Sequence, residues 1–580
     1  MGFDDEVSPE QHSRLRAFSP SKYQEFHVND YWWSFSMSDD ARTSLAELLR
    51  PQLLADEGRQ AVSDGELSFT FREVESLASR FASEFIRQGL RRGDRVVVLA
   101  SQTASIAPAA LGIWKAGGIY APIDAALPAE RFRAIVANIQ PAFIALVEGF
   151  ELPWPTSFDV PVVRLNSCAD SELPDAGSLP ALNGDDLAVI IHTSGSTGLP
   201  KGVTLSHGSV LAYFDGHRRV YGFTNESRCL NLTSFHFDVS FQDLFMPLSC
   251  GAYVLVNTDM LIPWFILPKI QEAALTHVIC ASSILALFTG DYGNLSKYDL
   301  TSLRAIGFGG ELTEPKLVNA WLEAVPGLRM VNCYGPTEAN SASLSYVIDA
   351  TTQRRAGYYP IGKPHKDVLT LLLDEDNKPI VSDDEVGELV VGGPVLMHGY
   401  WNNPIATERA FLQIDGKRFY RTGDLCSKDR DGNFVFQGRK DSEIKIAGRR
   451  INLLEISERL STLDMITNSH VTSVEVSGVK TLVALCEVKT SPDSRWLSDL
   501  PEMVNQYFPS HMRPRHFGLY RERLRTSTGK TDVRRLASML HEAVTKNAAY
   551  YYEYSAASEQ FMPIDPHPED LAKSRPARSG

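Results

Sequence analysis

Apolar residues recur along this chain with two alternating periods, which predicts a mostly parallel sheet covered by helices. The segment Phe71–Gln88 has apolar residues at the spacing of an amphipathic helix, and Asp94–Ala100 (DRVVVLA) is a run of the buried-strand type. The same alternation predicts a helix at Ile106–Ala116, a strand at Gly118–Ile123 and a helix at Glu130–Asn138. Apolar strands between amphipathic helices are typical of doubly wound α/β folds, in which helices cover both faces of the sheet.

This alternation continues through the middle of the chain and then changes. It returns at five segments: Val210–Tyr213, Ala252–Val256, Ile266–Ala274, Val278–Ala281 and Leu303–Phe308. From about Asp367 to Phe436 the chain consists of short strands between turns, such as GELVVGG at 387–393. Short strands at this spacing predict a small antiparallel, barrel-like subdomain.

A smaller unit with its own pattern follows residue 438. Helices near Leu454–Ser461 and Leu497–Tyr507 alternate with strands near Val471–Val476 and Thr481–Val488, which predicts a small α+β domain. The predicted units are therefore an N-terminal lead-in (1–38), a large domain (39–438), a small domain (439–546) and a tail (547–580). The tail is rich in proline, serine and charge, and we expect it to be disordered.

Composition narrows the class of protein. With 580 residues the chain is too long for one core, and 43% hydrophobic and 22% charged residues are ordinary for a globular protein. A net charge of −14 argues against non-specific binding to nucleic acid or anionic membranes. The seven cysteines include no CxxC pair, so we expect no zinc site and a reducing, cytoplasmic location. The sequence shows no secretory signal and no uninterrupted membrane span.

The clearest chemical signal follows the strand-like run Leu187–His192. The next eleven residues, TSGSTGLPKGV (Thr193–Val203), combine three glycines, four hydroxyl side chains and a lysine. Glycines let the backbone approach a ligand, and hydroxyls and a cation can bind phosphate oxygens. This loop is not a P-loop, because Pro200 precedes the lysine and Gly202 follows it; an exposed Ser/Gly loop is the alternative interpretation. The residues expected to bind phosphate are Thr193, Ser194, Gly195, Ser196, Thr197, Gly198 and Lys201.

Six further segments occur in the order found in one enzyme superfamily. They are WKAGGIYAPID (114–124), NCYGPTEA (332–339), GELVVGGPVLMHGYWN (387–402), YRTGDL (420–425), GRKDSEIKIAGRRINLLEIS (438–457) and STGKTD (527–532). Over about four-fifths of its length the chain resembles the adenylate-forming superfamily of acyl-CoA synthetases, luciferases and nonribosomal peptide synthetase adenylation domains. The resemblance implies ATP and Mg²⁺ as cofactors. It also implies a large domain of two doubly wound α/β subdomains plus a β-barrel-like subdomain, followed by a small mobile α+β domain.

The resemblance also implies roles for residues of the nucleotide site. Tyr334 would lie against adenine, Thr337 would meet the α-phosphate, and Glu338 would hold Mg²⁺. Asp424 would accept hydrogen bonds from the ribose hydroxyls, and Arg439 would also reach the ribose. Further positions assigned to this site are Gly310, Glu311 and Asn332.

Members of this superfamily catalyse two half-reactions by rotating the small domain, and Asp441 resembles their hinge residue. In the first pose Lys530 would bridge the substrate carboxylate and the α-phosphate. The segment before it, LRTSTGK, departs from the proline-rich pattern common in the family. In the second pose Lys445 and the loop at Ala447 and Gly448 would line the path of an attacking thiol.

The segment SFHFDVSFQDLFMPL (234–248) resembles the amino-acid-activating branch, in which the residue at Asp238 binds the substrate α-ammonium. A buried carboxylate would penalise fatty and aryl acids, which bring no cation. The alternative interpretation is that Asp238 caps a following helix. The pocket positions carried over from the family are Asp238, Val239, Gln242, Cys280, Gly307, Gly309, Cys333, Ser341, Ala342 and Lys530.

Most of these positions are small and uncharged, so we expect a neutral substrate side chain, with volume left open by Gly307 and Gly309. Gln242 could hydrogen-bond this side chain or only pack. The first three pocket residues, Asp238, Val239 and Gln242, are similar to those of proline-activating pockets. The segments around Asp238 and Glu311 also resemble D-alanine–carrier-protein ligases. The amino acid and its chirality therefore stay open.

The acceptor of the activated acid is inferred from motifs that the sequence lacks. Neither a carrier-type LGGxS serine nor a condensation-type HHxxxDG motif is present, so we expect transfer to the phosphopantetheine of a separate carrier protein. The main alternative is an acyl- or aryl-CoA synthetase, with coenzyme A as the acceptor. The motifs do not exclude a luciferase-like oxidation. A catalytically inactive interaction protein would have lost Glu338, Asp424 or Lys530, and all three are present.

Overall fold

The computed structural model describes most of the chain from residue 43 onward. The residues outside the description are 1–42, 148–149, 151–159, 166–178, 194–199, 290–292, 356, 383–384, 441–442, 477–478, 491–492, 522–532, 547–548, 550, 556–559 and 565–580. The predicted lead-in therefore lies outside the described residues. Residues 42–580 form one compact unit.

A seven-stranded sheet carries the segment before the predicted phosphate loop. Its strands in spatial order are β18 (Gly399–Tyr400), β8 (Lys201–Ser206), β7 (Leu187–Thr193), β4 (Ile119–Pro122), β3 (Arg95–Leu99), β5 (Phe143–Leu146) and β6 (Val162–Arg164). The strands from β7 to β6 are parallel, whereas β8 and β18 run antiparallel to their neighbours. Lys201 therefore begins a strand that pairs antiparallel with β7.

A nine-stranded sheet forms the second layer of parallel strands. Its spatial order is β15 (Lys363–Pro364), β14 (Leu344–Ile348), β13 (Arg329–Tyr334), β12 (Ala305–Gly309), β11 (His277–Ala281), β9 (Arg228–Asn231), β10 (Tyr253–Val256), β1 (Gln60–Ser63) and β2 (Ser68–Thr70). The strands from β13 to β1 are parallel. The chain thus aligns the carboxyl ends of β11, β12 and β13, where ligands of such sheets bind.

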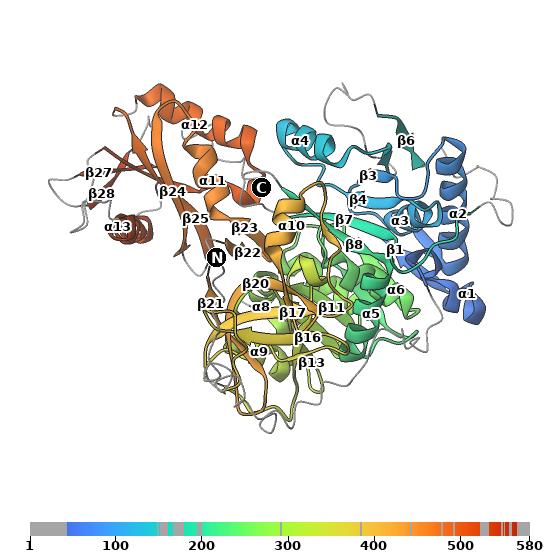
Figure 1. Ribbon diagram of the computed structural model, residues 1–580. Helices are drawn as coiled ribbons and strands as arrows, with labels where there is room; N and C mark the ends of the chain where they lie inside the picture. The colour runs from blue at the N-terminus through green and yellow to red at the C-terminus, as the bar shows by residue number, and fades with distance from the viewer. Residues whose placement is uncertain are drawn as a thin grey trace, which may run out of the picture. The chain divides into compact units, whose positions relative to one another are not determined.

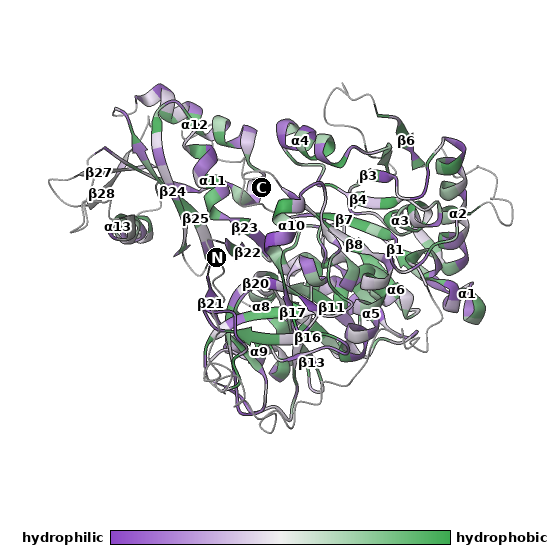
Figure 2. Ribbon diagram, viewed as in Figure 1, coloured by the Kyte–Doolittle hydropathy of each residue, from purple (hydrophilic) through white to green (hydrophobic). Residues whose placement is uncertain are grey.

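Helices pack on these two sheets (Figure 1). They are α1 (Arg50–Asp56), α2 (Phe71–Arg87), α3 (Ile106–Lys115), α4 (Ala129–Ile139), α5 (His207–Tyr221), α6 (Met246–Ser249), α7 (Pro263–Glu272), α8 (Ser282–Thr289) and α9 (Pro315–Ala324). Helix α2 begins with a capping box, in which Thr70 and Glu73 each accept a hydrogen bond from the other's backbone N–H. Figure 2 shows hydrophobic and hydrophilic residues side by side along α2 and α4, as expected for helices with one buried face.

The predicted barrel-like subdomain is a five-stranded antiparallel sheet. It consists of β16 (Leu369–Leu373), β17 (Gly387–Gly392), β19 (Phe411–Ile414), β20 (Lys417–Lys428) and β21 (Phe434–Arg439), with α10 (Pro404–Ala410) before β19. The register sets Asp424 of β20 directly opposite Arg439 of β21. Two predicted ribose-binding side chains are thus neighbours across one strand pair.

The remaining elements make up the C-terminal α+β part. A hairpin of β22 (Glu443–Ile446) and β23 (Arg449–Asn452) comes first. It is followed by α11 (Leu453–Leu460), β24 (Ile466–Val476), β25 (Val479–Val488), α12 (Ser494–Tyr507), β26 (His516–Tyr520), α13 (Val533–Lys546), β27 (Tyr551–Ser555) and β28 (Gln560–Ile564). The helices and strands predicted here are confirmed to within a few residues, except that β24 starts five residues earlier.

The prediction of a disordered tail after residue 546 is wrong for residues 551–555 and 560–564. Strand β27 pairs in parallel with β26, and β28 pairs with β27, so both extend the C-terminal sheet. The rings of Tyr551 and Tyr552 are buried, and the Tyr551 hydroxyl donates to the carbonyl of Leu497. The overall proline and serine content of the tail concealed this short aromatic strand, whose two buried rings stabilise it by removing apolar surface from water.

Candidate active site

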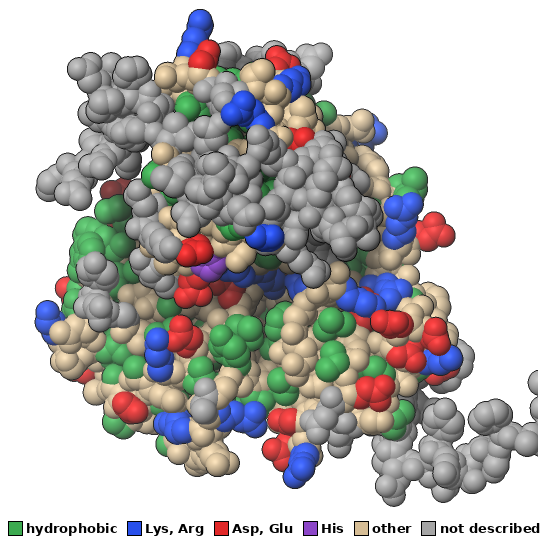
Figure 3. All heavy atoms as spheres, turned by 90° about the vertical axis from the view of Figure 1, so that its left-hand side faces the viewer, with side chains coloured by type: hydrophobic (Ala, Val, Ile, Leu, Met, Phe, Trp, Pro, Cys, Tyr) green, Lys and Arg blue, Asp and Glu red, His purple; other side chains and the backbone are tan. Residues whose placement is uncertain are grey.

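A cavity of about 450 Å³ lies at the carboxyl ends of β7, β11, β12 and β13. Residues of the C-terminal part, from the β22–β23 hairpin and from 509–512, also line it. Figure 3 shows a hollow on one face of the molecule in which acidic, basic and histidine side chains gather. Predicted site residues that border the cavity are Thr193, Asp238, Val239, Gln242, Cys280, Gly309, Gly310, Cys333, Thr337, Ser341, Asp424, Arg439 and Lys445.

Other predicted site residues do not border this cavity or lie outside the description. Those placed elsewhere are Lys201, Gly307, Glu311, Asn332, Tyr334, Glu338 and Ala342. Asn332, for example, donates to the carbonyl of Pro360 at 2.8 Å, and Ala342 is buried in the core. The predicted residues outside the described part of the chain are Ser194, Gly195, Ser196, Thr197, Gly198, Asp441 and Lys530.

Asp238 borders the cavity and is not a helix cap. The next helical segment is a π-helical turn at Phe241–Phe245, and its N-cap residue is Ser240, without a side-chain cap. Burial raises the pKa of the Asp238 carboxyl, although a hydrogen bond from Thr337 and the charge of Lys445 partly offset this effect. Among the described residues no Lys, Arg or His lies within ion-pair distance of Asp238. The carboxylate is therefore placed to accept a cationic group in the cavity.

The expectation that Gly307 and Gly309 leave volume open is wrong. A Cβ at Gly307 would lie 2.2 Å from the Tyr221 hydroxyl, and one at Gly309 would lie 2.2 Å from the carbonyl oxygen of Cys333. Protein atoms already fill the space beside both glycines. Glycine is required here because neighbouring elements pack directly against the backbone of β12.

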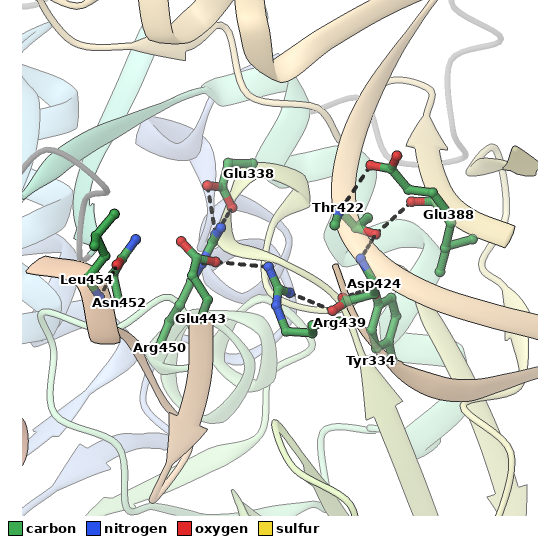
Figure 4. A network of polar contacts seen from close by, with 12 residues as sticks. Tyr334, Glu338, Glu388, Thr422, Asp424, Arg439, Glu443, Arg450, Asn452 and Leu454 are labelled. Atoms are coloured by element: carbon green, nitrogen blue, oxygen red, sulfur yellow. Dashed lines mark hydrogen bonds and ion pairs between the residues drawn. The ribbon is translucent and has the colours of Figure 1, made fainter. Parts of the chain in front are cut away.

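Asp424 and Arg439 also line the cavity, and Figure 4 shows the two side chains in contact. Arg439 Nη1 lies 2.5 Å from Asp424 Oδ1, and the Tyr334 hydroxyl donates to the other oxygen of Asp424. Tyr334 itself is buried beneath this contact. The Asp424 carboxylate is therefore fixed by two partners, with its exposed surface towards the cavity.

Arg450 is a site residue that the motif analysis did not single out. Its Nη1 lies 2.9 and 3.0 Å from the two carboxylate oxygens of Glu338, and its Nε lies 2.6 Å from Glu443 (Figure 4). Tyr400 also donates to Glu338 at 2.7 Å. Burial opposes ionisation of Glu338, but Arg450 and Tyr400 outweigh it and hold the pKa of Glu338 below its usual range. The only sequence signal for Arg450 is its place in the segment 438–457.

One chain of polar contacts thus connects Glu338 with Asp424. Glu443 accepts hydrogen bonds from both Arg450 and Arg439, and Arg439 contacts Asp424. Glu338, the predicted metal ligand, is 1% exposed beneath this chain. In this arrangement an arginine of the β22–β23 hairpin neutralises the carboxylate that Mg²⁺ would otherwise neutralise.

The tip of the same hairpin enters the cavity wall. The backbone N–H of Gly448 donates to Glu311 Oε1 at 2.9 Å. A Cβ on Gly448 would lie 2.8 Å from Cβ of Ala281, and one on Gly310 would lie 3.3 Å from Cα of Gly448. Two glycine backbones therefore meet where any larger side chain would prevent the approach.

The residues present fit a polar, anionic ligand. The ring nitrogens of His192 and Nε2 of His236 are buried at the cavity, with no hydrogen-bond partner among the described residues. Burial lowers the pKa of each imidazole to about 4, so both are neutral near pH 7 and can each donate one hydrogen bond. No cluster of three or more metal-ligating side chains occurs in the described part of the chain. Mg²⁺ needs only one or two carboxylates besides phosphate oxygens and water, so Glu338 fits that ion.

Comparison with known proteins identifies the family of this chain. The family model described as "AMP-binding enzyme" matches residues 50–401. The chain belongs to this family. The AMP-binding match spans the large α/β part, including the cavity residues of β7, β11, β12 and β13. The resemblance to the adenylate-forming superfamily is thereby confirmed.

Relatives of this AMP-binding enzyme include very large synthetases. Malpibaldin synthetase of Mortierella alpina is 31% identical over 489 residues, which are 82% of this chain and 9% of that protein. Tyrocidine synthase 1 of Brevibacillus parabrevis is 29% identical, over 88% of this chain and 46% of that protein. The chain thus spans less than half the length of either relative.

Solved structures of similar fold support the predicted architecture. PA1221, described as a nonribosomal peptide synthetase protein containing adenylation and PCP domains, has a TM-score of 0.76 at 25% identity. It covers 86% of this chain, and this chain covers 84% of it. The o-succinylbenzoate CoA synthetase of Bacillus subtilis has a TM-score of 0.74 at 20% identity, with 85% and 98% coverage, and so shares the fold. The predicted fold class is confirmed. The described part of the chain contains no helix long and apolar enough to cross a membrane.

The Arg450 contacts of this AMP-binding enzyme predict a change in hairpin stability. Arg450→Met is expected to speed amide hydrogen exchange in β22 and β23 about 100-fold in the nucleotide-free protein, because buried Glu338 loses its arginine partner and Glu443 keeps only Arg439. Arg459→Met is the matched control: Arg459 pairs with Glu130 at 3.3 Å, with side chains 39% and 64% exposed. Exposed pairs contribute little, so the control should change exchange less than about threefold. Equal exchange rates in wild type and Arg450→Met would contradict the assigned contact.

Proposed function

We propose that this protein uses Mg·ATP to activate a neutral amino acid as its aminoacyl-adenylate and then transfers it to a thiol. The acceptor in this proposal is the phosphopantetheine arm of a separate carrier protein. One observation carries the proposal: a single cavity is lined by Asp238 and also by the paired Asp424 and Arg439. The Asp238 carboxylate can bind an ammonium group, and the Asp424–Arg439 pair can bind a ribose.

The cavity also presents groups suited to the reacting atoms. Thr337 lines the cavity and hydrogen-bonds Asp238, so it lies where the substrate carboxylate would meet the α-phosphate. The substrate carboxylate is ionised at neutral pH, so no general base is required. Bound Mg²⁺ would neutralise charge on the phosphate oxygens, and Glu338 would hold it. In the proposal Lys530 supplies a further cation for the transition state.

The transfer step rests on the β22–β23 hairpin. Lys445 and Gly448 border the cavity, and burial lowers the pKa of the Lys445 ammonium while Asp424 and Asp238 partly offset this. A thiol that reaches the adenylate must pass these residues, as the family resemblance implies. In this pose Arg450 contacts both carboxylate oxygens of Glu338, so the hairpin and a Mg²⁺ ion cannot both bind that carboxylate. We therefore assign this arrangement to the step after pyrophosphate and its metal have left.

Carrier-domain neighbours support the choice of acceptor. PA1221 contains adenylation and PCP domains, and NpsA–ThdA from Klebsiella oxytoca is described as a fused adenylation–PCP didomain. These descriptions belong to those proteins. For this chain the carrier protein, like the amino acid, is part of the proposal.

ATP–pyrophosphate exchange over a panel of acids tests the proposal. Proteinogenic, D- and β-amino acids are compared with fatty and aryl acids of similar size. Exchange above background only with amino acids is the expected result. Exchange only with fatty or aryl acids would replace the proposal by an acyl- or aryl-CoA synthetase.

The same assay tests the role assigned to Lys530. Lys530→Ala is expected to lower the exchange rate about 100-fold or more, because a charge that stabilises the transition state is removed. Binding of ATP, followed by calorimetry, should change much less, since the lysine acts on the transition state. An unchanged exchange rate would refute the assigned role.

A further inference from the structure

Tyr221, the last residue of α5, lies directly behind the wall of the cavity. It is 3% exposed and is not among the residues that border the cavity. It packs in one apolar cluster with Val239, Ile279 and Cys333, and these three do border the cavity. The phenol ring packs against the rings of His217 and Phe223, with centroid distances of 5.0 and 5.1 Å, and these contacts hold it in place.

The phenol of Tyr221 occupies the space beside Gly307. A Cβ on Gly307 would lie 2.2 Å from the Tyr221 hydroxyl oxygen and 2.8 Å from two ring carbons. Carbon atoms that are not bonded do not approach this closely, so Gly307 cannot carry a side chain while Tyr221 is present. Tyr221, 86 positions away from Gly307 in the sequence, therefore fills the space beside Gly307 and behind the cavity residues Val239, Ile279 and Cys333.

The hydroxyl of Tyr221 also orients polar groups of the wall. It donates to Gln242 Oε1 at 3.4 Å and lies 3.2 Å from Cys333 Sγ. The other end of the Gln242 amide donates to Ser341 Oγ at 2.9 Å. These contacts decide which end of the Gln242 amide faces Ser341, and both side chains border the cavity.

The thiol and imidazole groups around this wall are neutral near pH 7, and burial raises the pKa of the Asp243 carboxyl to about 7. Burial raises the pKa of the Cys280 and Cys333 thiols to about 12, and burial lowers the pKa of His217, whose Nε2 lies 3.3 Å from Gln242 Oε1. The buried carboxyl of Asp243 already accepts hydrogen bonds from the Asn231 side chain and from two backbone N–H groups. A charged substrate side chain would find no counter-charge here and would incur a desolvation penalty of several kcal/mol.

We propose that Tyr221 is a specificity-determining residue, which closes the amino-acid pocket from behind Val239, Ile279 and Cys333 and restricts the substrate to a short, uncharged side chain. This inference rests on the proposed amino-acid activation and names the substrate class of the same site. Tyr221 acts through Gly307 and Gln242 and does not touch the reacting atoms.

The test is a side-chain-length profile by ATP–pyrophosphate exchange. Wild type and Tyr221→Ala are assayed with the straight-chain α-amino acids from alanine to norleucine and with lysine and glutamate. Wild type is expected to prefer the short neutral members. In Tyr221→Ala, kcat/KM is expected to rise about tenfold for side chains longer by two or more carbons and to fall for the shortest, because opened volume admits apolar atoms.

Four further variants separate pocket depth from general damage to the fold. Tyr221→Phe keeps the ring and loses only the hydroxyl, so it should keep the wild-type length preference. Gly307→Ala added to Tyr221→Ala returns a methyl group to the opened space, so it should shift the preference back towards short side chains. Gly307→Ala alone should lose activity, because its methyl group overlaps the phenol. If Tyr221→Ala is not recovered as folded protein, Tyr221→Leu is expected to show the same shift.

The outcomes distinguish this inference from the proposed function. Activity of wild type with no amino acid would overturn the proposed function. Wild-type activity with amino acids, but an unchanged length profile in Tyr221→Ala or Tyr221→Leu, would overturn only the role of Tyr221. A wild-type preference for lysine, glutamate or long side chains would also overturn it.

Discussion

Replacing Asp238 with asparagine is expected to lower kcat/KM for amino-acid activation roughly 100- to 1,000-fold, since a buried charge pair is lost. The asparagine keeps the shape of the side chain and removes only the negative charge that attracts an ammonium group. The measurement is ATP–pyrophosphate exchange with the amino acid that wild type prefers. The KM for ATP should change little, because the residues proposed to bind the ribose are Asp424 and Arg439 and not Asp238.

The control for Asp238→Asn is a comparison of two substrates, the preferred amino acid and its des-amino analogue, instead of a second variant. Wild type is expected to discriminate strongly against the des-amino analogue of its preferred acid, because Asp238 would then lie buried without a cation. The variant should lose most of this discrimination, which loss of folded protein would not cause. An unchanged ratio between the amino acid and its analogue would show that Asp238 does not bind the ammonium.

Replacing Gly448 with alanine is expected to separate the two half-reactions. Its φ of +72° is strained for alanine, and the new Cβ would lie 2.8 Å from Cβ of Ala281, so the hairpin tip cannot reach the cavity wall as it does here. Transfer of the activated acid to phosphopantetheine should fall about 10- to 100-fold, from a packing cost of about 1–3 kcal/mol. Pyrophosphate exchange should change less than about threefold, because adenylation uses the other pose.

Gly416 provides a matched control for Gly448→Ala. It has the same φ of +72°, in the turn between β19 and β20, but no atom lies within 4 Å of its added Cβ. Gly416→Ala therefore carries the same backbone strain, about 1 kcal/mol, without the steric overlap. Equal losses of transfer in the two variants would attribute the effect to backbone strain and refute the docking role of the hairpin tip. Single-turnover loading and exchange assays on the same preparations make the comparison.

Much of the architecture followed from local sequence. The apolar runs of β3 and β4 and the helical spacing of α2 and α3 predict a covered parallel sheet, because a strand buried on both faces must be apolar throughout. The short strand β27 was missed, since its signal is two buried tyrosines within a segment of mostly polar composition. Composition averages over a segment, whereas a strand needs only a few well-packed residues.

The candidate site was predictable where the chemistry lies within one motif. Asp238, Thr337, Asp424 and Lys445 were each singled out from motif resemblance, and all four border the cavity. Arg450 and Tyr221 were not predicted, because their main contacts lie outside any one motif. Each acts on a residue at least 86 positions away in the chain, and no local pattern records that partner.

By itself the sequence determined the family, the order of the subdomains and the residue types that a nucleotide and an ammonium group require. Only the tertiary structure decided that Arg450 neutralises Glu338, that the Gly448 tip packs on Ala281, and that Tyr221 fills the space beside Gly307. The physical reason is that motif chemistry is carried by neighbouring residues. Charge pairing and free volume depend instead on which distant side chains the packed core brings within about 4 Å.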